Sequence, residues 1–312
     1  MHNYFIIPQA KRSILATIEQ ETIVPVRHID IPFESKSLIT DNGYIVSLYR
    51  TNKKLRVHDL AGNLIYKEDD FCFDALNVKG NIAYLGGKSK DSLHQKGCGE
   101  IFAIIDLNHF PFKIKQVELP IQLTNGKSID DILIRNNTLI LVDDIVHPKY
   151  ILEYNIENQD NPSFIKMNCL PRNGSYENIK KGDINTDYMV LFSTTCGNRG
   201  ISQHIVVSGK VDQTVKRSIS AEDLLSDEFD VKKYWSYKDI CLIENILVLV
   251  RTDGVGYFDL QSDDLDVDTF HHIETPLPNE DRIIKTPCNQ PIAINEHGYH
   301  LLKCVNNKWI DQ

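Results

Sequence analysis

Carboxylate side chains are the residues of this 312-residue chain whose spacing most suggests chemistry. Residues 263–268 read DDLDVD, an alternation that could provide oxygen ligands to Ca²⁺. A calcium loop of the EF-hand type also needs Gly at its sixth position and Glu at its twelfth, where this chain has Thr269 and Thr275. We therefore interpret residues 263–268 as a solvated acidic turn. The adjacent acids Asp130–Asp131 and Asp143–Asp144 could serve glycoside hydrolysis, but sequence spacing does not give the carboxylate separation that this reaction requires.

Two other groups of residues are weaker candidates. His271 and His272 are adjacent, and adjacent residues on a strand point to opposite faces, so they are not expected to bind one metal ion together. Cys196 lies in a Gly-containing turn before His204, without a third group to orient a base. The sequence also lacks a Walker loop, a G-x-S-x-G elbow and an H-E-x-x-H motif. We therefore predict no catalytic residue, no bound metal and no cofactor.

The charge of the chain is unevenly distributed. The sequence has 34 Lys+Arg and 43 Asp+Glu, a net charge of −9, which argues against a nucleic-acid-binding surface. Residues 221–312 contain 18 Asp+Glu and 8 Lys+Arg, whereas residues 1–220 contain 25 and 26. The excess negative charge therefore lies in the last third of the chain, where it would attract a basic partner.

The composition predicts a cytoplasmic protein with no membrane association. Hydrophobic residues make up 42% and charged residues 25%, as in ordinary globular proteins. The N-terminal apolar run is too short for a signal peptide, and no apolar stretch is long enough to cross a membrane. The seven cysteines are scattered without a C-x-x-C pair, which favours reduced thiols.

Strand-like runs recur along the whole chain. Each follows a Gly, Asn or Asp and is apolar, β-branched or aromatic for about six residues. Several are apolar on both faces, as in Leu247–Val250, which is typical of strands covered on both sides. The runs are GYIVSLYR, GNIAYLGG, NTLILVDD, DYMVLFST, NILVLVRT and GYHLLKCV.

A second marker recurs after these runs: a short strand that ends in Asp or Asn. Its positions are 59, 106, 155, 259 and 311, with gaps of 47, 49, 104 and 52 residues. The double gap leaves room for one member near residue 207, so we count six units of about 50 residues. Short strands at such a period, with little helix, predict a β-propeller.

At these residues the chain resembles the WD-repeat and quinoprotein-like β-propeller superfamily, with degenerate repeats. The pairs His58-Asp59, Ile105-Asp106 and Phe258-Asp259 occupy the place of the Trp-Asp dipeptide. The resemblance implies one all-β domain over 1–312 and concerns fold rather than activity. The predicted blades are residues 32–70, 71–120, 121–171, 172–220, 231–278, and 279–312 completed by 13–31.

The last predicted unit ends before its outer strand, so we expect the N-terminal strand within 13–31 to close a six-bladed ring beside the C-terminal strand. The alternative is a pair of β-sandwich domains, which also show regularly spaced strands. One segment differs from the rest: Ser220 is a helix N-cap residue, and the apolar residues after it have helical spacing. We predict a short helical insertion near 220–230.

The leading functional hypothesis is a non-enzymatic propeller that binds a basic protein, and in its most specific form an acidic inhibitor or immunity protein that neutralises a nuclease toxin. One alternative is a propeller hydrolase or lyase with an acidic, Ca²⁺-dependent axial site, and another is an assembly scaffold. Two aromatic residues would anchor the partner and nine acidic residues would attract it. These partner-binding residues are Tyr234, Trp235, Glu222, Asp223, Asp227, Glu228, Asp230, Asp263, Asp264, Asp266 and Asp268.

Overall fold

The structure is a computed structural model. It describes residues 3–89, 100–117, 129–143, 151–157, 176–197, 200–209, 215–220, 237–251, 254–261, 270–273, 281–305 and 308–311. Every regular element in these ranges is a β-strand. The helix predicted near 220–230 falls almost wholly outside the described residues. Within the described ranges, no helix has the length and apolar character of a membrane span.

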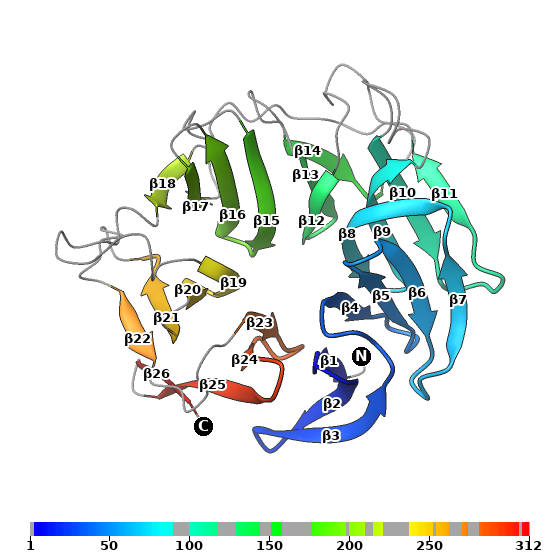
Figure 1. Ribbon diagram of the computed structural model, residues 1–312, viewed down its shortest axis with the longest axis horizontal. Helices are drawn as coiled ribbons and strands as arrows, with labels where there is room; N and C mark the ends of the chain where they lie inside the picture. Colours follow the sequence, from blue (N-terminus) through cyan, green and yellow to red (C-terminus); the bar gives the residue numbers. More distant parts are fainter. Residues whose placement is uncertain are drawn as a thin grey trace.

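The described strands form seven antiparallel sheets, here called sheets I to VII, and in each sheet the strand order follows the chain (Figure 1). Sheets I and II contain β1 (Phe5–Ile7), β2 (Ser13–Glu19) and β3 (Thr22–Ile29), followed by β4 (Ser35–Ile39), β5 (Ile45–Tyr49), β6 (Lys54–His58) and β7 (Leu64–Glu68). Sheets III and IV contain β8 (Phe71–Lys79), β9 (Ile82–Ser89), β10 (Glu100–Asp106) and β11 (Ile114–Val117), followed by β12 (Ile129–Arg135), β13 (Thr138–Asp143) and β14 (Ile151–Asn155).

The remaining three sheets have four strands each. Sheet V contains β15 (Tyr176–Ile184), β16 (Tyr188–Gly197), β17 (Gly200–Gly209) and β18 (Val215–Ser220). Sheet VI contains β19 (Tyr237–Ile243), β20 (Ile246–Arg251), β21 (Gly254–Asp259) and β22 (His271–Ile273). Sheet VII contains β23 (Arg282–Lys285), β24 (Pro291–Ile294), β25 (Tyr299–Val305) and β26 (Lys308–Asp311).

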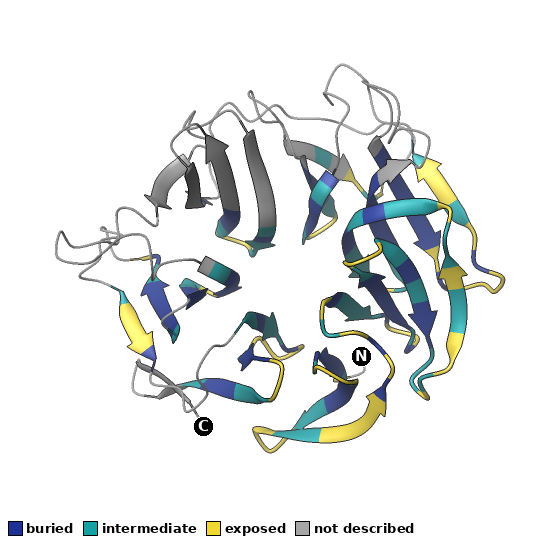
Figure 2. Cartoon of the chain, in the orientation of Figure 1, coloured by how far each residue is buried: buried dark blue, intermediate teal, exposed yellow. Residues whose placement is uncertain are grey.

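The first strand of each sheet lies toward the centre of the ring, and the last lies toward its rim (Figure 1). Middle strands such as β5 and β20 are largely buried, whereas outer strands such as β3, β11 and β22 carry exposed residues (Figure 2). On β20, Leu247 and Leu249 pack in the cluster shared with sheet V, and Val248 and Val250 pack in the cluster shared with sheet VII. This arrangement explains why such strands are apolar on both faces.

Apolar clusters join every sheet to the next, and sheet VII to sheet I. Phe5 and Ile7 of β1 pack with Ile292 and Ile294 of β24 in one such cluster. Ile6, Leu15 and Ile29 of sheet I pack against Ile45 of sheet II in another. The N-terminal sheet therefore lies between the C-terminal sheet and sheet II and completes the ring by packing (Figure 1).

This arrangement differs from the closure that we predicted. Residues 13–31 do not add an outer strand to the last unit, because β2 pairs with β1 and β3 pairs with β2. Sheet VII has four strands within residues 282–311, since β23, β24 and β26 have only four residues each. The run after Gly298 is the third strand of that sheet and not its second. The expected six units therefore correspond to seven sheets.

The recurring Asp or Asn has a structural explanation. Oδ1 of Asp106 accepts a hydrogen bond from the backbone N–H of Asn108 at 2.9 Å. Oδ1 of Asn155 and Oδ1 of Asp259 likewise each accept the backbone N–H of the residue two positions later, also at 2.9 Å. The next residue, such as Leu107, donates its N–H to the carbonyl of Asn81, the turn residue before β9, at 2.8 Å. The turn residue before one strand and the Asp or Asn after the next strand thus belong to turns that are hydrogen-bonded to each other. These residues recur because they stabilise the turns, and their recurrence does not indicate a binding site.

Candidate axial site

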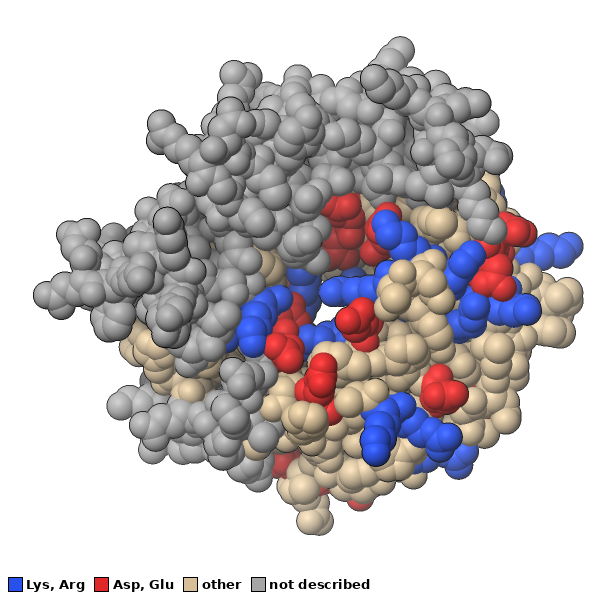
Figure 3. Space-filling model, in the orientation of Figure 1, with Lys and Arg blue, Asp and Glu red and all other residues tan. Residues whose placement is uncertain are grey.

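The centre of the ring contains a cavity of about 860 Å³, lined by the first strands of all seven sheets. Lys, Arg, Asp and Glu side chains surround the opening (Figure 3). The cavity wall therefore mixes apolar and charged residues, and its charged groups come from segments far apart in the sequence.

Asp131 shows how the carboxylates of this wall are held. Its side chain is only 5% exposed. Oδ2 accepts the backbone N–H of Gly182, on the first strand of the next sheet, at 2.7 Å, and Oδ1 accepts the N–H of Ile132 at 2.9 Å. Gly182 permits this approach, because a Cβ there would lie 3.0 Å from side-chain carbons of Leu133 and Leu191. The carboxylate is a direct link between sheets IV and V.

The same arrangement recurs at the next two joints between sheets. Each aspartate accepts one N–H from its own strand and one from the first strand of the following sheet. Asp183 accepts those of Ile184 and Leu242, both at 2.8 Å, and Asp239 accepts those of Ile240 and Ile283, both at 2.9 Å. In sheet III, Asn77 takes this place and donates its amide to the carbonyl of Ile132 at 2.8 Å. We call Asp131, Asp183 and Asp239 the axial aspartates.

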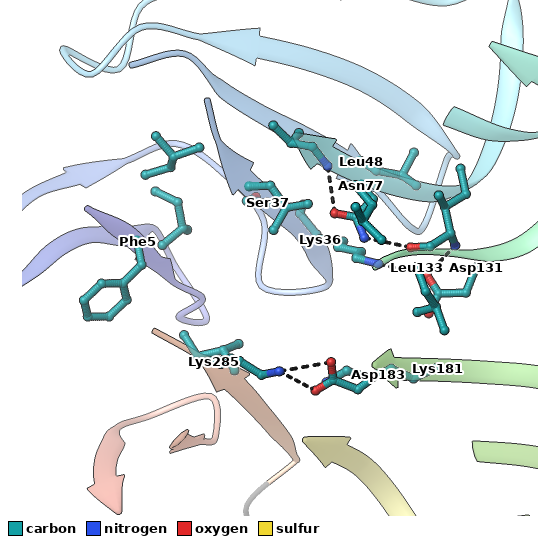
Figure 4. A pocket seen from close by; sticks show the side chains of 18 of the residues that line it. Phe5, Lys36, Ser37, Leu48, Asn77, Asp131, Leu133, Lys181, Asp183 and Lys285 are labelled. Atoms are coloured by element: carbon teal, nitrogen blue, oxygen red, sulfur yellow. Dashed lines mark hydrogen bonds and ion pairs between the residues drawn. The ribbon is translucent and has the colours of Figure 1, made fainter. Parts of the chain in front are cut away.

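Three lysines pair with the axial aspartates, and Figure 4 shows the pairs of Lys36 with Asp131 and of Lys285 with Asp183. Nζ of Lys36 on β4 lies 2.9 Å from Asp131, which is two sheets away. Nζ of Lys285 on β23 lies 3.0 Å from Asp183, again two sheets away. Nζ of Lys181 lies 2.7 Å from Asp239 of the adjacent sheet. Burial alone would lower the pKa of Lys285, but Asp183 outweighs it and raises that pKa.

These contacts leave the axial aspartates poorly suited to catalysis. Each carboxylate already accepts two backbone N–H groups and an ammonium, so it is committed as a charged acceptor. Cys241 also lines the cavity, but burial raises the pKa of its thiol to about 12 and keeps it protonated. Among the described residues, no cluster of three His, Cys, Asp or Glu could hold a metal ion.

Arg282 of β23 differs from these paired groups. Its guanidinium donates to two backbone carbonyls, those of Phe33 and Ser35, the latter at 3.2 Å. It also lies over the Phe33 ring, 5.6 Å from the centroid. Burial lowers the pKa of Arg282 to about 10, so the side chain still carries its positive charge at neutral pH.

None of the eleven partner-binding residues predicted from the sequence lies among the described residues, so the structure neither gathers nor separates them. His271 and His272 are described, and they contact different aromatic rings: His271 stacks on Tyr257 and His272 meets Phe270 edge-on.

The axial aspartates were missed as a group, although the sequence carries a signal for them. Each is followed directly by isoleucine on the first strand of its sheet, and they lie 52 and 56 residues apart. Asn77, followed by Val78, precedes Asp131 by 54 residues. This repeat has the period of the other markers, but it comes from the inner strands rather than from the turns.

The chain is similar to known proteins in fold only. No family model matches it, and neither does any curated protein. Hydrazine synthase from Kuenenia stuttgartiensis is similar over 97% of this chain and 95% of its own, with a TM-score of 0.62 and 11% identity. A candidate 6-phosphogluconolactonase from Bacteroides uniformis is similar over 99% and 95%, with a TM-score of 0.60 and 13% identity.

A third similar structure is the extracellular domain of a candidate hybrid two-component system from B. thetaiotaomicron, with a TM-score of 0.57 and 12% identity. The similarity covers 95% of this chain and 37% of that one. Together with the ring of antiparallel sheets, these similarities show that the chain has an all-β, propeller-like fold.

Proposed function

We propose that this chain is a non-enzymatic, cytoplasmic β-propeller that binds a basic protein through its acidic C-terminal third. The single observation that carries the proposal is the charge distribution: residues 221–312 have 18 Asp+Glu against 8 Lys+Arg, while the rest of the chain is nearly neutral. Such a sector speeds the capture of a cationic partner, an effect that salt weakens. In its most specific form the partner is a toxin nuclease, whose phosphate-binding surface is basic, and the chain is its inhibitor.

The axial contacts support a binding role over a catalytic one. Asp131, Asp183 and Asp239 are engaged by lysines and by backbone N–H groups, which rigidifies the ring without leaving a free acid or base among these three side chains. A rigid ring presents loops from every sheet over a wide platform, which suits recognition of a macromolecule. We infer that the seven sheets are the blades of one closed propeller of the WD-repeat-like kind.

In this proposal, acidic residues of 222–230 and 263–268 attract the partner, and Tyr234 and Trp235 anchor it. Large aromatic side chains concentrate binding energy where they are buried at an interface. Neutralising the acids should therefore slow association, whereas truncating the aromatic residues should speed dissociation.

An affinity capture from the host, washed at low and at high salt, tests the proposal. The tagged full chain should retain a basic protein that high salt releases, and the purified partner should then bind in a titration. The test variant carries Asp263→Asn, Asp264→Asn, Asp266→Asn and Asp268→Asn. The matched control carries four changes at exposed acids of the neutral part: Glu19→Gln, Asp30→Asn, Glu34→Gln and Asp41→Asn.

The test variant should bind more weakly, with intact folding, while the control should bind like the natural chain. Equal binding by all three proteins would refute the acidic sector. A partner held equally at low and high salt would indicate instead an assembly scaffold.

The axial cavity favours a second candidate, a hydrolase or lyase with an acidic axial site. Its volume of about 860 Å³ falls within the range of small-molecule sites, and aspartates contribute to its wall. A Ca²⁺-dependent enzyme should gain thermal stability on addition of Ca²⁺ and lose it with a chelator. An unfolding midpoint that responds to neither would rule out the Ca²⁺-dependent form.

A further inference from the structure

Arg282 is a positively charged residue on the cavity wall. Among the described residues, no Asp or Glu oxygen lies within 4.0 Å of its guanidinium. Asp239 on the neighbouring sheet contributes favourable electrostatics, but Lys181 and two backbone N–H groups already occupy its oxygens. Lys36, Lys181 and Lys285 each pair with an axial aspartate, whereas Arg282 does not.

Charges on the side of sheet II act on Arg282 in both directions, and Glu34 there raises its pKa. Arg50, which also lines the cavity, is close enough to lower the pKa of Arg282 further. A guanidinium has five N–H donors, and two carbonyls do not use them all. Planar, bidentate recognition of carboxylate or phosphate is the interaction to which this group is best suited.

A second, independent observation comes from Ser35 on β4. This residue is 2% exposed and lines the cavity, and among the described residues its hydroxyl has no hydrogen-bond partner. Its carbonyl accepts the hydrogen bond from Nη2 of Arg282, which places the two residues side by side. A buried hydroxyl without a partner costs free energy unless a ligand or water satisfies it.

We propose that Arg282 and Ser35 form the recognition point of a binding site for a small-molecule oxyanion, a carboxylate or a phosphate, in the axial cavity. The guanidinium pairs with the anion, Ser35 donates its hydroxyl to a second oxygen, and Arg50 adds positive potential. The site is independent of the proposed protein interface, since it uses none of the acidic or aromatic residues assigned to that interface.

Isothermal titration of the purified full chain with sodium phosphate, and separately with sodium citrate, tests this site at an ionic strength held constant with NaCl. We expect one of the two anions to bind, and the arm that gives heat distinguishes a phosphate site from a carboxylate site. Arg282→Gln should weaken that binding by about 10- to 100-fold, because it removes a charge-assisted hydrogen bond. Ser35→Ala should weaken it by about 2- to 10-fold.

Lys303→Gln is the control, because Lys303 pairs with Glu21 on the surface, away from the cavity. It should leave the affinity unchanged. If Arg282→Gln does not fold, the anion affinities of Arg282→Lys and Ser35→Ala test the site instead, since both changes keep most of the packing. The absence of binding by both anions up to about 10 mM, or equal binding by the natural chain and the folded variants, would overturn the site.

Discussion

The joints between sheets IV, V, VI and VII differ from those on either side of sheet I. In the former, an axial aspartate links neighbouring first strands and pairs with a lysine. In the latter, the described contacts are chiefly apolar, as where Ile7 packs with Ile292 and Ile294. The polar joints need a complete set of partners, because a buried charge or N–H left alone is costly. The apolar joints need only volume and shape.

The largest effect should come from Asp131→Ala at a polar joint. This change leaves Lys36, the N–H of Gly182 and the N–H of Ile132 without their acceptor, and we expect it to lower the free energy of unfolding by about 3–5 kcal/mol. Urea unfolding followed by circular dichroism measures it. Asp131→Asn keeps one acceptor oxygen and should cost less. A loss below about 1 kcal/mol for the alanine variant would contradict a structural role.

A conservative change at the apolar joint should have a smaller effect. Ile7 is fully buried between sheets I and VII, so Ile7→Val removes one methylene and should cost about 0.5–1.5 kcal/mol. The same urea experiment compares it directly with Asp131→Ala. A loss as large as that of Asp131→Ala would remove the distinction between the two kinds of joint.

The stability of the chain should also depend on pH through His58, which lies on β6 of sheet II. Burial lowers the pKa of His58, although Asp30 and Asp59 oppose this, so the unfolded chain takes up a proton more readily than the folded one. Stability from this group is therefore present above the ordinary pKa of about 6.5 and is lost as the pH falls toward the folded value. His58→Phe should flatten the fall of the unfolding midpoint between about pH 7.5 and about pH 5.5. An unchanged slope would exclude His58 as its source.

The smallest effect should come from an ion pair nearer the surface. Lys238 lies 2.8 Å from Asp281, whose side chain is 42% exposed, so solvent screens the attraction. Lys238→Gln should cost about 0–1 kcal/mol in the urea experiment. A larger loss would mean that pairing as such, and not the buried double N–H acceptance of the axial aspartates, stabilises the inner wall.

Much of the fold could be predicted from local pattern, because a strand buried on both faces must be apolar throughout, as Leu247–Val250 is. The number of units could not, because the sheets do not contain strands of equal length. Sheet VII has short strands, and β24 begins at a proline and has only four residues, so its run was not recognised. Spacing alone then placed the run after Gly298 one strand too early.

The axial site was harder to predict than the fold. Asp131 stood out only as one of two adjacent acids, whereas Asp183 and Asp239 look like ordinary polar residues in a strand. The lysine partners of all three lie on other sheets. Only the arrangement of the sheets around the axial cavity brings Lys36 and Asp131 together from 95 residues apart. The resemblance to WD-repeat proteins in sequence stays a prediction, and it would not have indicated these residues.

The salt dependence of partner binding tests the central claim most directly. The dissociation constant of the captured basic protein should be measured from low to high ionic strength for the natural chain and for the variant with Asp263, Asp264, Asp266 and Asp268 changed to Asn. We predict a steep weakening with salt for the natural chain and a clearly shallower one for the variant, with the two converging at high salt. Parallel curves for the two proteins would contradict the claim that the acidic sector attracts the partner.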